Sequence, residues 1–197
     1  MAALQLLLSV CLVASASGFI VMSVGQCPNI PTKPDFDLNK YLGLWFSYEN
    51  FDAPFQWATT CVSALYSLKP NGNIRVINSG FRDIRIFGRS VHRSSTRAVG
   101  EAYIVNSTQP GGLNVRFGNQ PDLDGGKANY LVVDTDYDNY SVVYSCSQQS
   151  ILKIELAWIL TRVRGQAPAN VDAIKANLEA YDVDTSNFKR IDHSNCS

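Results

Sequence analysis

Short segments of alternating apolar and polar residues, separated by turn signals, run from about residue 44 to residue 161. Turns such as Pro70-Asn71-Gly72-Asn73 and Pro110-Gly111-Gly112 are typical of chain reversals between antiparallel strands. The expected strands cover residues 44–49, 61–68, 74–79, 100–105, 113–117, 130–135, 141–145 and 151–161, and residues 81–87 either continue the third strand or start a fourth. Eight strands in an up-and-down meander close into a barrel that holds one small ligand.

The last expected strand shows which face of this sheet is apolar. The apolar residues of one parity are Leu152, Ile154, Leu156, Trp158 and Leu160, and the other parity carries Lys153 and Glu155. Because successive side chains of a strand point to opposite faces, we expect the apolar set to point into the barrel and the two charges outward. Trp158 is then either part of a cavity wall or part of a filled core.

One amphipathic helix is expected after this strand, over residues 169–180. Val171, Ile174, Leu178 and Tyr181 are spaced by three or four residues and form one apolar face, and Pro168 suits the first turn. A short helix of this kind covers its own core, and a short strand at 188–191 follows it. The predicted fold class is therefore all-β: an eight-stranded up-and-down antiparallel β-barrel with one C-terminal α-helix packed outside.

The first 25 residues differ from the rest of the chain. No charged side chain occurs from Ala2 to Gly25, and the apolar run 4–13 is followed by the small residues 14–18. This layout is typical of a signal peptide, although no Lys or Arg precedes the apolar run. We expect residues 1–25 to be a signal peptide cut between about 16 and 25 (after Ala16, Gly18 or Gly25), and residues 26–197 to be one secreted, extracellular domain. The alternative is an N-terminal membrane anchor.

The cysteines and the charge agree with export. Cys11 lies in the segment to be removed, whereas Cys27, Cys61, Cys146 and Cys196 remain and allow two disulfides in three connectivities. No Cys-x-x-Cys or Cys/His cluster occurs, so no metal site is expected. The 17 basic and 17 acidic residues give no net charge, which argues against nucleic acid as a partner.

Three Asn-x-Ser/Thr sequons start at Asn106, Asn139 and Asn195. Asn106 lies beside an expected turn and is the best glycosylation candidate. Asn139, the second candidate, lies in a tight hairpin, and Asn195 precedes a cysteine that is expected to be bridged.

Three motifs in order resemble those of the lipocalin family. Gly43-Leu44-Trp45 resembles the first motif, Thr135-Asp136-Tyr137 the second, and Trp158-Ile159-Leu160-Thr161-Arg162 the third, in which an arginine ends the last strand. The resemblance spans nearly the whole mature chain. It is strongest to the apolipoprotein D branch, which includes insect bilin-binding proteins and crustacean carotenoid-binding lipocalins.

The resemblance implies a disulfide pairing and a set of structural residues. The implied bridges are Cys27–Cys146 and Cys61–Cys196. The implied structural residues are Gly43, Trp45, Thr135, Asp136, Tyr137 and Arg162. Trp45 should plug the closed end of the barrel, with the Arg162 guanidinium on its indole face.

The resemblance also implies a pocket for a small hydrophobic ligand, such as a retinoid, carotenoid, bilin, fatty acid or sterol, with no cofactor required. Tyr66 and Trp158 resemble pocket-lining positions of apolipoprotein D. Phe117 and Arg82 match in a region of different length, and Tyr130 and Phe46 match by position alone. Arg82 is either a partner for a ligand carboxylate or an exposed loop charge.

Two segments suggest further contacts. Phe51, Phe55 and Trp57 lie in the loop expected over the open mouth, where they form a lid, fold back on the rim, or meet a membrane or another subunit. The arginines at positions 85, 89, 93 and 97 recur every four residues, as on a helix face. Gly88 and the run Ser94-Ser95-Thr96 nevertheless favour a surface loop there.

Three functional hypotheses follow from these residues. The first is a secreted carrier of a small hydrophobic ligand. The second is a pigment-binding subunit of a protein assembly, or a signalling or defence lipocalin that acts by sequestration. The third is an enzyme of the kind that uses a cavity thiol, but every mature cysteine has a disulfide position. Neither His92 nor His193 lies in a catalytic motif, so we expect no enzymatic activity.

Overall fold

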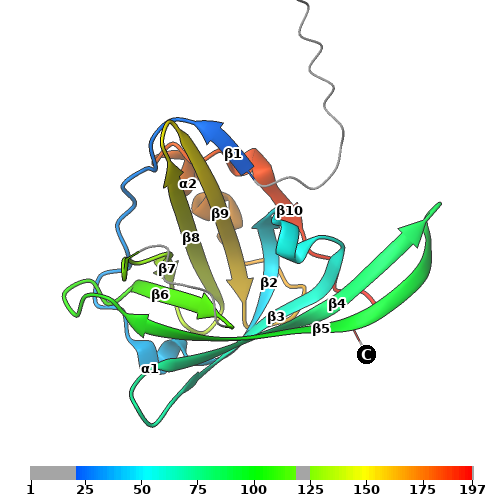
Figure 1. Cartoon of the computed structure of the whole chain (residues 1–197), viewed down its shortest axis with the longest axis horizontal. Helices are drawn as coiled ribbons and strands as arrows, with labels where there is room; N and C mark the ends of the chain where they lie inside the picture. Colours follow the sequence, from blue (N-terminus) through cyan, green and yellow to red (C-terminus); the bar gives the residue numbers. More distant parts are fainter. Residues whose placement is uncertain (1–20, 119–124, 197) are drawn as a thin grey trace, which may run out of the picture.

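Eight antiparallel strands close into a barrel in the computed structural model, which describes residues 21–118 and 125–196 (Figure 1). The strands are β2 (Gly43–Phe51), β3 (Thr59–Leu68), β4 (Ile74–Ile86), β5 (Arg89–Ile104), β6 (Gly112–Phe117), β7 (Tyr130–Thr135), β8 (Tyr140–Gln149) and β9 (Leu152–Thr161). Each strand pairs with its neighbour in sequence, and β9 also pairs with β2. This pairing closes the barrel and confirms the predicted fold class.

Two further strands extend the sheet beyond the barrel. β1 (Val21–Val24) pairs with the first half of β9, and β10 (Phe188–Arg190) pairs with the end of β2. The short turns η1 (Pro54–Gln56) and η2 (Thr185–Asn187) precede β3 and β10. Residues 1–20, which make up most of the expected signal peptide, lie outside the described residues. Within the described part of the chain, no helix is long and apolar enough to cross a membrane.

A helix covers one outer face of the barrel, as predicted. α2 (Val171–Glu179) lies against the strands in Figure 1, and Ile174 and Leu178 are buried in a cluster with outward-facing residues of β8 and β9. The prediction that Glu155 points away from the barrel interior agrees with its place beside buried Ala157 and Ile159. This face is buried and not solvated, however. The Glu155 carboxylate accepts a hydrogen bond from the Tyr144 hydroxyl at 2.7 Å and pairs with Lys153 at 2.9 Å.

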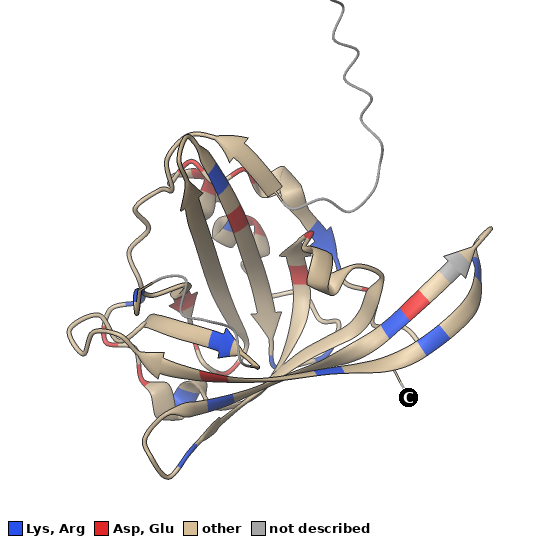
Figure 2. Cartoon of the chain, viewed as in Figure 1, with Lys and Arg blue, Asp and Glu red and all other residues tan. Residues whose placement is uncertain are grey.

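The prediction of a surface loop around residues 85–97 is wrong. β4 and β5 continue past the barrel as a two-stranded arm, which projects to the right in Figure 1 and carries basic positions along its length in Figure 2. Phe87 and Gly88 form its turn, with φ of 48° and 77°. A two-residue hairpin turn with both φ values positive normally uses Asn-Gly or Asp-Gly. Because Phe87 occupies the first position here, the sequence did not indicate a turn. A spacing of four also fits one face of a strand, because it is a multiple of two.

Both disulfides implied by the resemblance are present. Cys27–Cys146 ties the N-terminal segment to β8, and Cys61–Cys196 ties the C-terminal tail to β3. The bridged residues are 119 and 135 positions apart in sequence. Loops of that length give a chain-entropy stabilisation of about 4–5 kcal/mol per bridge as an upper figure. The two bridges therefore fix both ends of the domain to the barrel wall.

The closed end of the barrel is built around Trp45 and Arg162. The Trp45 ring is fully buried, and its Nε1 donates to the Tyr41 carbonyl at 2.8 Å, at the end of α1 (Leu38–Tyr41). The Arg162 guanidinium lies 3.7 Å from the centre of the Trp45 ring. It donates to five carbonyls, those of Lys40, Tyr41, Leu42, Leu44 and Tyr137. One side chain thus joins α1, β2 and the β7–β8 turn.

The β7–β8 turn is fixed by the second motif. The Thr135 hydroxyl donates to the Tyr140 carbonyl and accepts from the Tyr137 amide. The Asp136 carboxylate accepts from the amides of Asn139 and Tyr140. Burial favours a higher pKa for Asp136, but these hydrogen bonds outweigh it and lower the pKa below its usual value. These contacts agree with the structural role that the resemblance implies for the motif residues.

We predict that Arg162→Lys costs about 2–4 kcal/mol of unfolding free energy, because an ammonium group cannot reach five carbonyls and stack on the indole. Urea denaturation followed by circular dichroism measures the change. The matched control is Arg164→Lys, at an exposed arginine that stacks on Phe46 at 4.7 Å, with an expected cost under about 0.5 kcal/mol. Equal effects of the two substitutions would contradict the role given to Arg162.

Candidate ligand-binding site

The barrel encloses a cavity of about 810 Å³ above its packed closed end. The closed end is filled by a cluster that includes Tyr41, Trp45, Ile74, Leu113 and Val143. Beyond this cluster the inward-facing side chains leave a hollow between them. A volume of this size lies within the usual range for sites that bind small molecules. The alternative of a filled interior is therefore excluded.

Four of the six expected ligand residues lie on the cavity wall. Tyr66 (β3), Phe117 (β6), Tyr130 (β7) and Trp158 (β9) all line it. The Tyr130 and Trp158 rings stack with their centres 6.2 Å apart. Alternation along β9 also brings Leu156 and Leu160 to the wall, as predicted. The contact of these residues with a ligand stays a prediction.

Phe46 and Arg82 do not line the cavity. Trp45 points into the barrel, so its neighbour Phe46 points outward, where its ring lies beneath Arg164 and edge-on to His193. Arg82 lies on β4 opposite Thr59, where the arm leaves the barrel, and its Nε atom is buried without a hydrogen-bond partner in the described structure. The pocket role expected for Phe46 is therefore wrong, and Arg82 is not part of the cavity wall.

The aromatic loop at the mouth divides into two parts. Phe51 is the last residue of β2 and is buried against Phe188, with 4.7 Å between the ring centres. The prediction that Phe51 lies in the loop over the mouth is therefore wrong. Phe55 and Trp57 are 62 % and 53 % exposed. Phe55 also lines the cavity. The rim thus carries large apolar side chains that the barrel does not cover.

The floor of the cavity carries linked hydroxyl groups. The Tyr130 hydroxyl lies 3.0 Å from that of Tyr41 and 2.8 Å from that of Tyr66. The Ser141 hydroxyl donates to Tyr41 at 3.2 Å. Burial raises the pKa of all three phenols, well above the usual value for Tyr66 and Tyr130. The floor is therefore neutral and polar, and the walls above it combine aromatic and aliphatic side chains with polar ones.

The sequence pattern did not predict the polar side chains of this site. They are Tyr41 and Ser141, which lie behind the floor, and Ser63, Asn78 and Ser145, which line the cavity. The alternation Ser145-x-Ser147-x-Gln149 on β8 was a usable signal, because a polar set of one parity beside an apolar set marks one face of the strand. All three of these β8 residues line the cavity, as do Cys146 and Gln148 of the other parity, so alternation alone does not separate the two faces at this end of β8.

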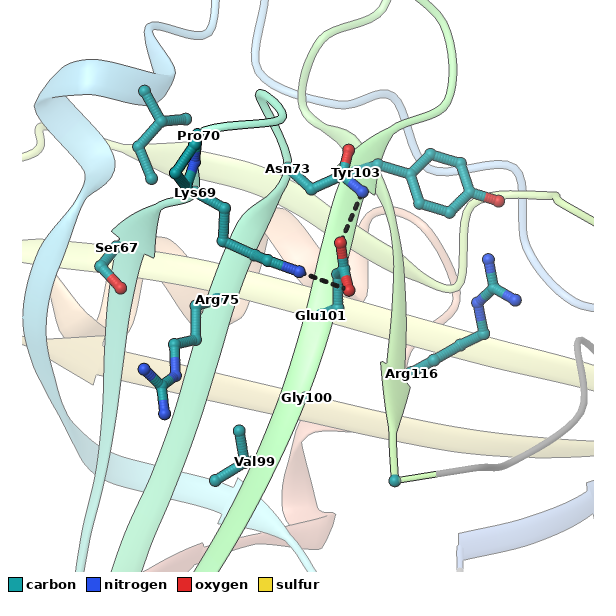
Figure 3. A pocket seen from close by; sticks show the side chains of 12 residues that line it. Ser67, Lys69, Pro70, Asn73, Arg75, Val99, Gly100, Glu101, Tyr103 and Arg116 are labelled. Carbon is teal, nitrogen blue, oxygen red and sulfur yellow. Dashed lines mark hydrogen bonds and ion pairs between the residues drawn. The ribbon is translucent and has the colours of Figure 1, made fainter.

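A second concave region lies outside the barrel, on the outer face of β3 to β6, and is shown in Figure 3. One ion pair lies within it, between Glu101 and Lys69 at 2.8 Å, and the Asn73 side-chain amide donates to Glu101 at 2.6 Å. The Arg116 guanidinium lies 5.5 Å from the centre of the Tyr103 ring. The hydrogen bond from Lys69, followed by that from Asn73, lowers the pKa of Glu101 to about 2. A Cβ atom at Gly100 would lie 2.5 Å from the Arg116 carbonyl, so this glycine lets β5 and β6 approach closely. These contacts stabilise the sheet and leave the interior cavity as the candidate site.

The described residues contain no group of His, Cys, Asp or Glu side chains that could hold a metal ion.

Of the two glycosylation candidates, Asn106 is exposed in the β5–β6 loop. The amide nitrogen of Asn139 donates to Asp136 at 2.7 Å. Modification of either asparagine stays a prediction.

Comparisons with known proteins agree with this architecture. The family model of a lipocalin-like domain matches residues 36–193. Apolipoprotein D of Cavia porcellus is 36% identical over 94% of this chain and 91% of its own length, and the Lazarillo protein of Schistocerca americana is 30% identical over 81% of this chain and 71% of its own. Among solved structures, insecticyanin of the tobacco hornworm Manduca sexta has a TM-score of 0.71 at 22% identity, covering 91% of this chain and 93% of its own. Lobster apocrustacyanin A1 has a TM-score of 0.67 at 21% identity, covering 89% and 93%.

We predict that Tyr41, Tyr66 and Tyr130 keep their protons until the barrel unfolds in alkali. Their pKa values are above 10.0 in the folded chain, so the folded state holds protons that the unfolded state releases. The unfolding free energy is therefore unaffected at lower pH and falls as the pH rises past about 10. Tyrosinate absorbance and far-ultraviolet circular dichroism, recorded together, should change in one transition for these residues. Tyr66→Phe should remove one tyrosine from its amplitude, and full ionisation with the sheet intact would contradict the burial argument.

Proposed function

We propose that this chain, which belongs to the lipocalin family, is a secreted carrier that binds a small hydrophobic molecule in the cavity of its barrel. The cavity of about 810 Å³, with aromatic walls and a neutral floor, is the observation that supports this function. Apolipoprotein D, insecticyanin and apocrustacyanin share the family or the fold. Their similarity and the hollow interior point to binding in the same place.

Ligand binding here is driven by removal of apolar surface from water. Transfer of apolar area contributes about 25 cal/mol per Å². Tyr130, Trp158 and Phe117 supply broad flat walls for this contact, and polar groups at the floor and on the walls set orientation. The ligands that fit are a retinoid, carotenoid, bilin, fatty acid or sterol.

A role within an assembly is the second candidate, and exposed apolar side chains at the mouth favour it. Phe55 and Trp57 lie on the rim, and Phe87 at the tip of the arm is fully exposed. Large exposed apolar patches mark contacts with proteins or membranes. We propose that these side chains meet a second subunit or a membrane surface. Size-exclusion chromatography with and without retinal tests the first arrangement, and vesicle flotation tests the second.

Secretion is supported by the disulfides, which form in oxidising compartments. The pairing of Val21–Val24 with β9 along the whole length of β1 favours a cleavage site before this strand. We propose cleavage after Ala16 or Gly18, which keeps this strand. Cleavage after Gly25 would remove it and leave that edge of β9 unpaired.

Binding without catalysis is the expected mode of action. The four cysteines of the described chain are all in disulfides, so none offers a cavity thiol. His193 packs against Phe46 on the outside and contacts the Ser47 carbonyl at 2.7 Å. Burial lowers its pKa, which keeps it neutral near pH 7.

We predict that Ser145→Phe weakens ligand binding at least about tenfold, because a phenyl ring in mid-cavity takes the volume that the ligand needs. Quenching of tryptophan emission by retinal, a bilin, a fatty acid and a sterol measures the affinity. Ser67→Phe, which adds the same ring on the outer face of β3, is the matched control and should bind normally. If the unaltered protein binds none of these compounds, the carrier function is wrong.

Expression in a secreting eukaryotic cell should yield a protein without free thiols. Signal cleavage removes Cys11, and the two bridges use the other four cysteines. Thiol titration in denaturant and the intact mass check this prediction and the cut site. One thiol per chain would show that the N-terminal segment is retained, and a mass that starts at Gln26 would contradict the place given to β1.

A further inference from the structure

The hydroxyl cluster at the cavity floor has one more proton than it has hydrogen bonds within itself. Ser141, Tyr41, Tyr130 and Tyr66 form a linear chain of four hydroxyls joined by three contacts of 3.2, 3.0 and 2.8 Å. Each hydroxyl has one proton, and each contact uses one proton. One proton is therefore left over whichever way the bonds run.

Burial decides where this proton lies. Ser141 donates to Tyr41, and Tyr41 is fully buried behind the floor and does not line the cavity. A free proton on Tyr41 would be an unsatisfied buried donor, which costs about 1–3 kcal/mol. Tyr41 therefore donates to Tyr130, and the surplus proton lies on Tyr66 or on Tyr130. Both of these side chains line the cavity.

We propose that this barrel selects ligands that carry a neutral carbonyl oxygen at the end that enters first, and that the phenol of Tyr66 or Tyr130 donates to it. This inference rests on the proposed carrier function and adds an orientation and a ligand class to it. A ketone or aldehyde oxygen satisfies the surplus proton, whereas a hydrocarbon end that covers the floor leaves it unpaired.

The charges around the cavity favour a neutral carbonyl over a carboxylate at this depth. Lys127, in the loop between β6 and β7, is the one basic side chain among the described residues that line the cavity, and it lies at the exposed mouth. A buried carboxylate without a cation beside it is costly. A fatty acid would therefore keep its head at the mouth, and a carbonyl compound would bind with its oxygen at the floor.

The test compares two probes of one shape: all-trans-retinal, and its analogue in which a methylene group replaces the aldehyde oxygen. We expect retinal to bind about five- to tenfold more tightly than the hydrocarbon, as one neutral hydrogen bond predicts. Raman spectroscopy of bound retinal should show the carbonyl stretch lowered by hydrogen bonding.

Three variants separate the proton from the shape of the floor. Either single substitution, Tyr66→Phe or Tyr130→Phe, leaves one phenol proton facing the cavity and should keep the preference for retinal. The double variant Tyr66→Phe with Tyr130→Phe should bind both probes equally and lose the carbonyl shift. Tyr48→Phe, on the outer face beneath Arg190, is the control for loss of a tyrosine hydroxyl and should behave like the unaltered protein.

The two levels of the proposal fail differently. Failure of both probes to bind would overturn the carrier function itself. Equal binding of both probes to the unaltered protein would overturn the carbonyl preference alone. The carbonyl preference would also be overturned if the double variant still bound retinal more tightly than the hydrocarbon or still showed the carbonyl shift. Circular dichroism must show that the barrel of this variant is intact.

Discussion

The contact between Arg162 and Trp45 holds together the elements on which the rest of the barrel depends. The guanidinium stacks on the indole at 3.7 Å and binds carbonyls from α1, from β2 and from the β7–β8 turn. Burial lowers the pKa of Arg162, but a guanidinium stays charged at any physiological pH. Because these carbonyls are at the ends of elements, where no helix or sheet partner is available, a side chain with several fixed donors is needed there. The first and last barrel strands are thereby held together where the sheet closes.

A barrel anchored at one end can remain hollow at the other. Large side chains such as Tyr41 and Trp45 fill the closed end, and the outer face of β8 and β9 is buried beneath α2. These two cores lie on opposite faces of the same strands, so stability does not require a filled interior. The two disulfides add to this by fixing the N-terminal segment and the C-terminal tail to the wall. The upper interior is then free to bind a ligand.

Strand parity could be predicted well where one motif residue fixed it, and poorly where the chain leaves the barrel. Trp158 was expected on the cavity wall from alternation along its strand and from the resemblance, and Tyr66 from the resemblance alone; both line the cavity. Phe46 was misplaced although its neighbour Trp45 already determined its direction. The arm was missed because Phe87 occupies a left-handed turn position that sequence statistics assign to Asn or Gly. Arg82 has the inward parity of β4, but it does not line the cavity. β4 is long enough to continue past the barrel, and Arg82 lies where the strand has already passed the rim.

The sequence by itself determined the all-β barrel, the outer helix, the closed-end motif and the family. These features depend on local periodicity and on motif residues, such as Trp45 and Arg162, whose structural role few other side chains can fill. Only the tertiary structure decided that the interior is hollow, that Glu155 is buried, and that Tyr41, Tyr130, Tyr66 and Ser141 join at the floor. The reason is that these properties depend on how side chains from strands up to 100 residues apart meet in space. Alternation assigns a side chain to a face of the sheet, but it does not specify how much of the space on that face is filled.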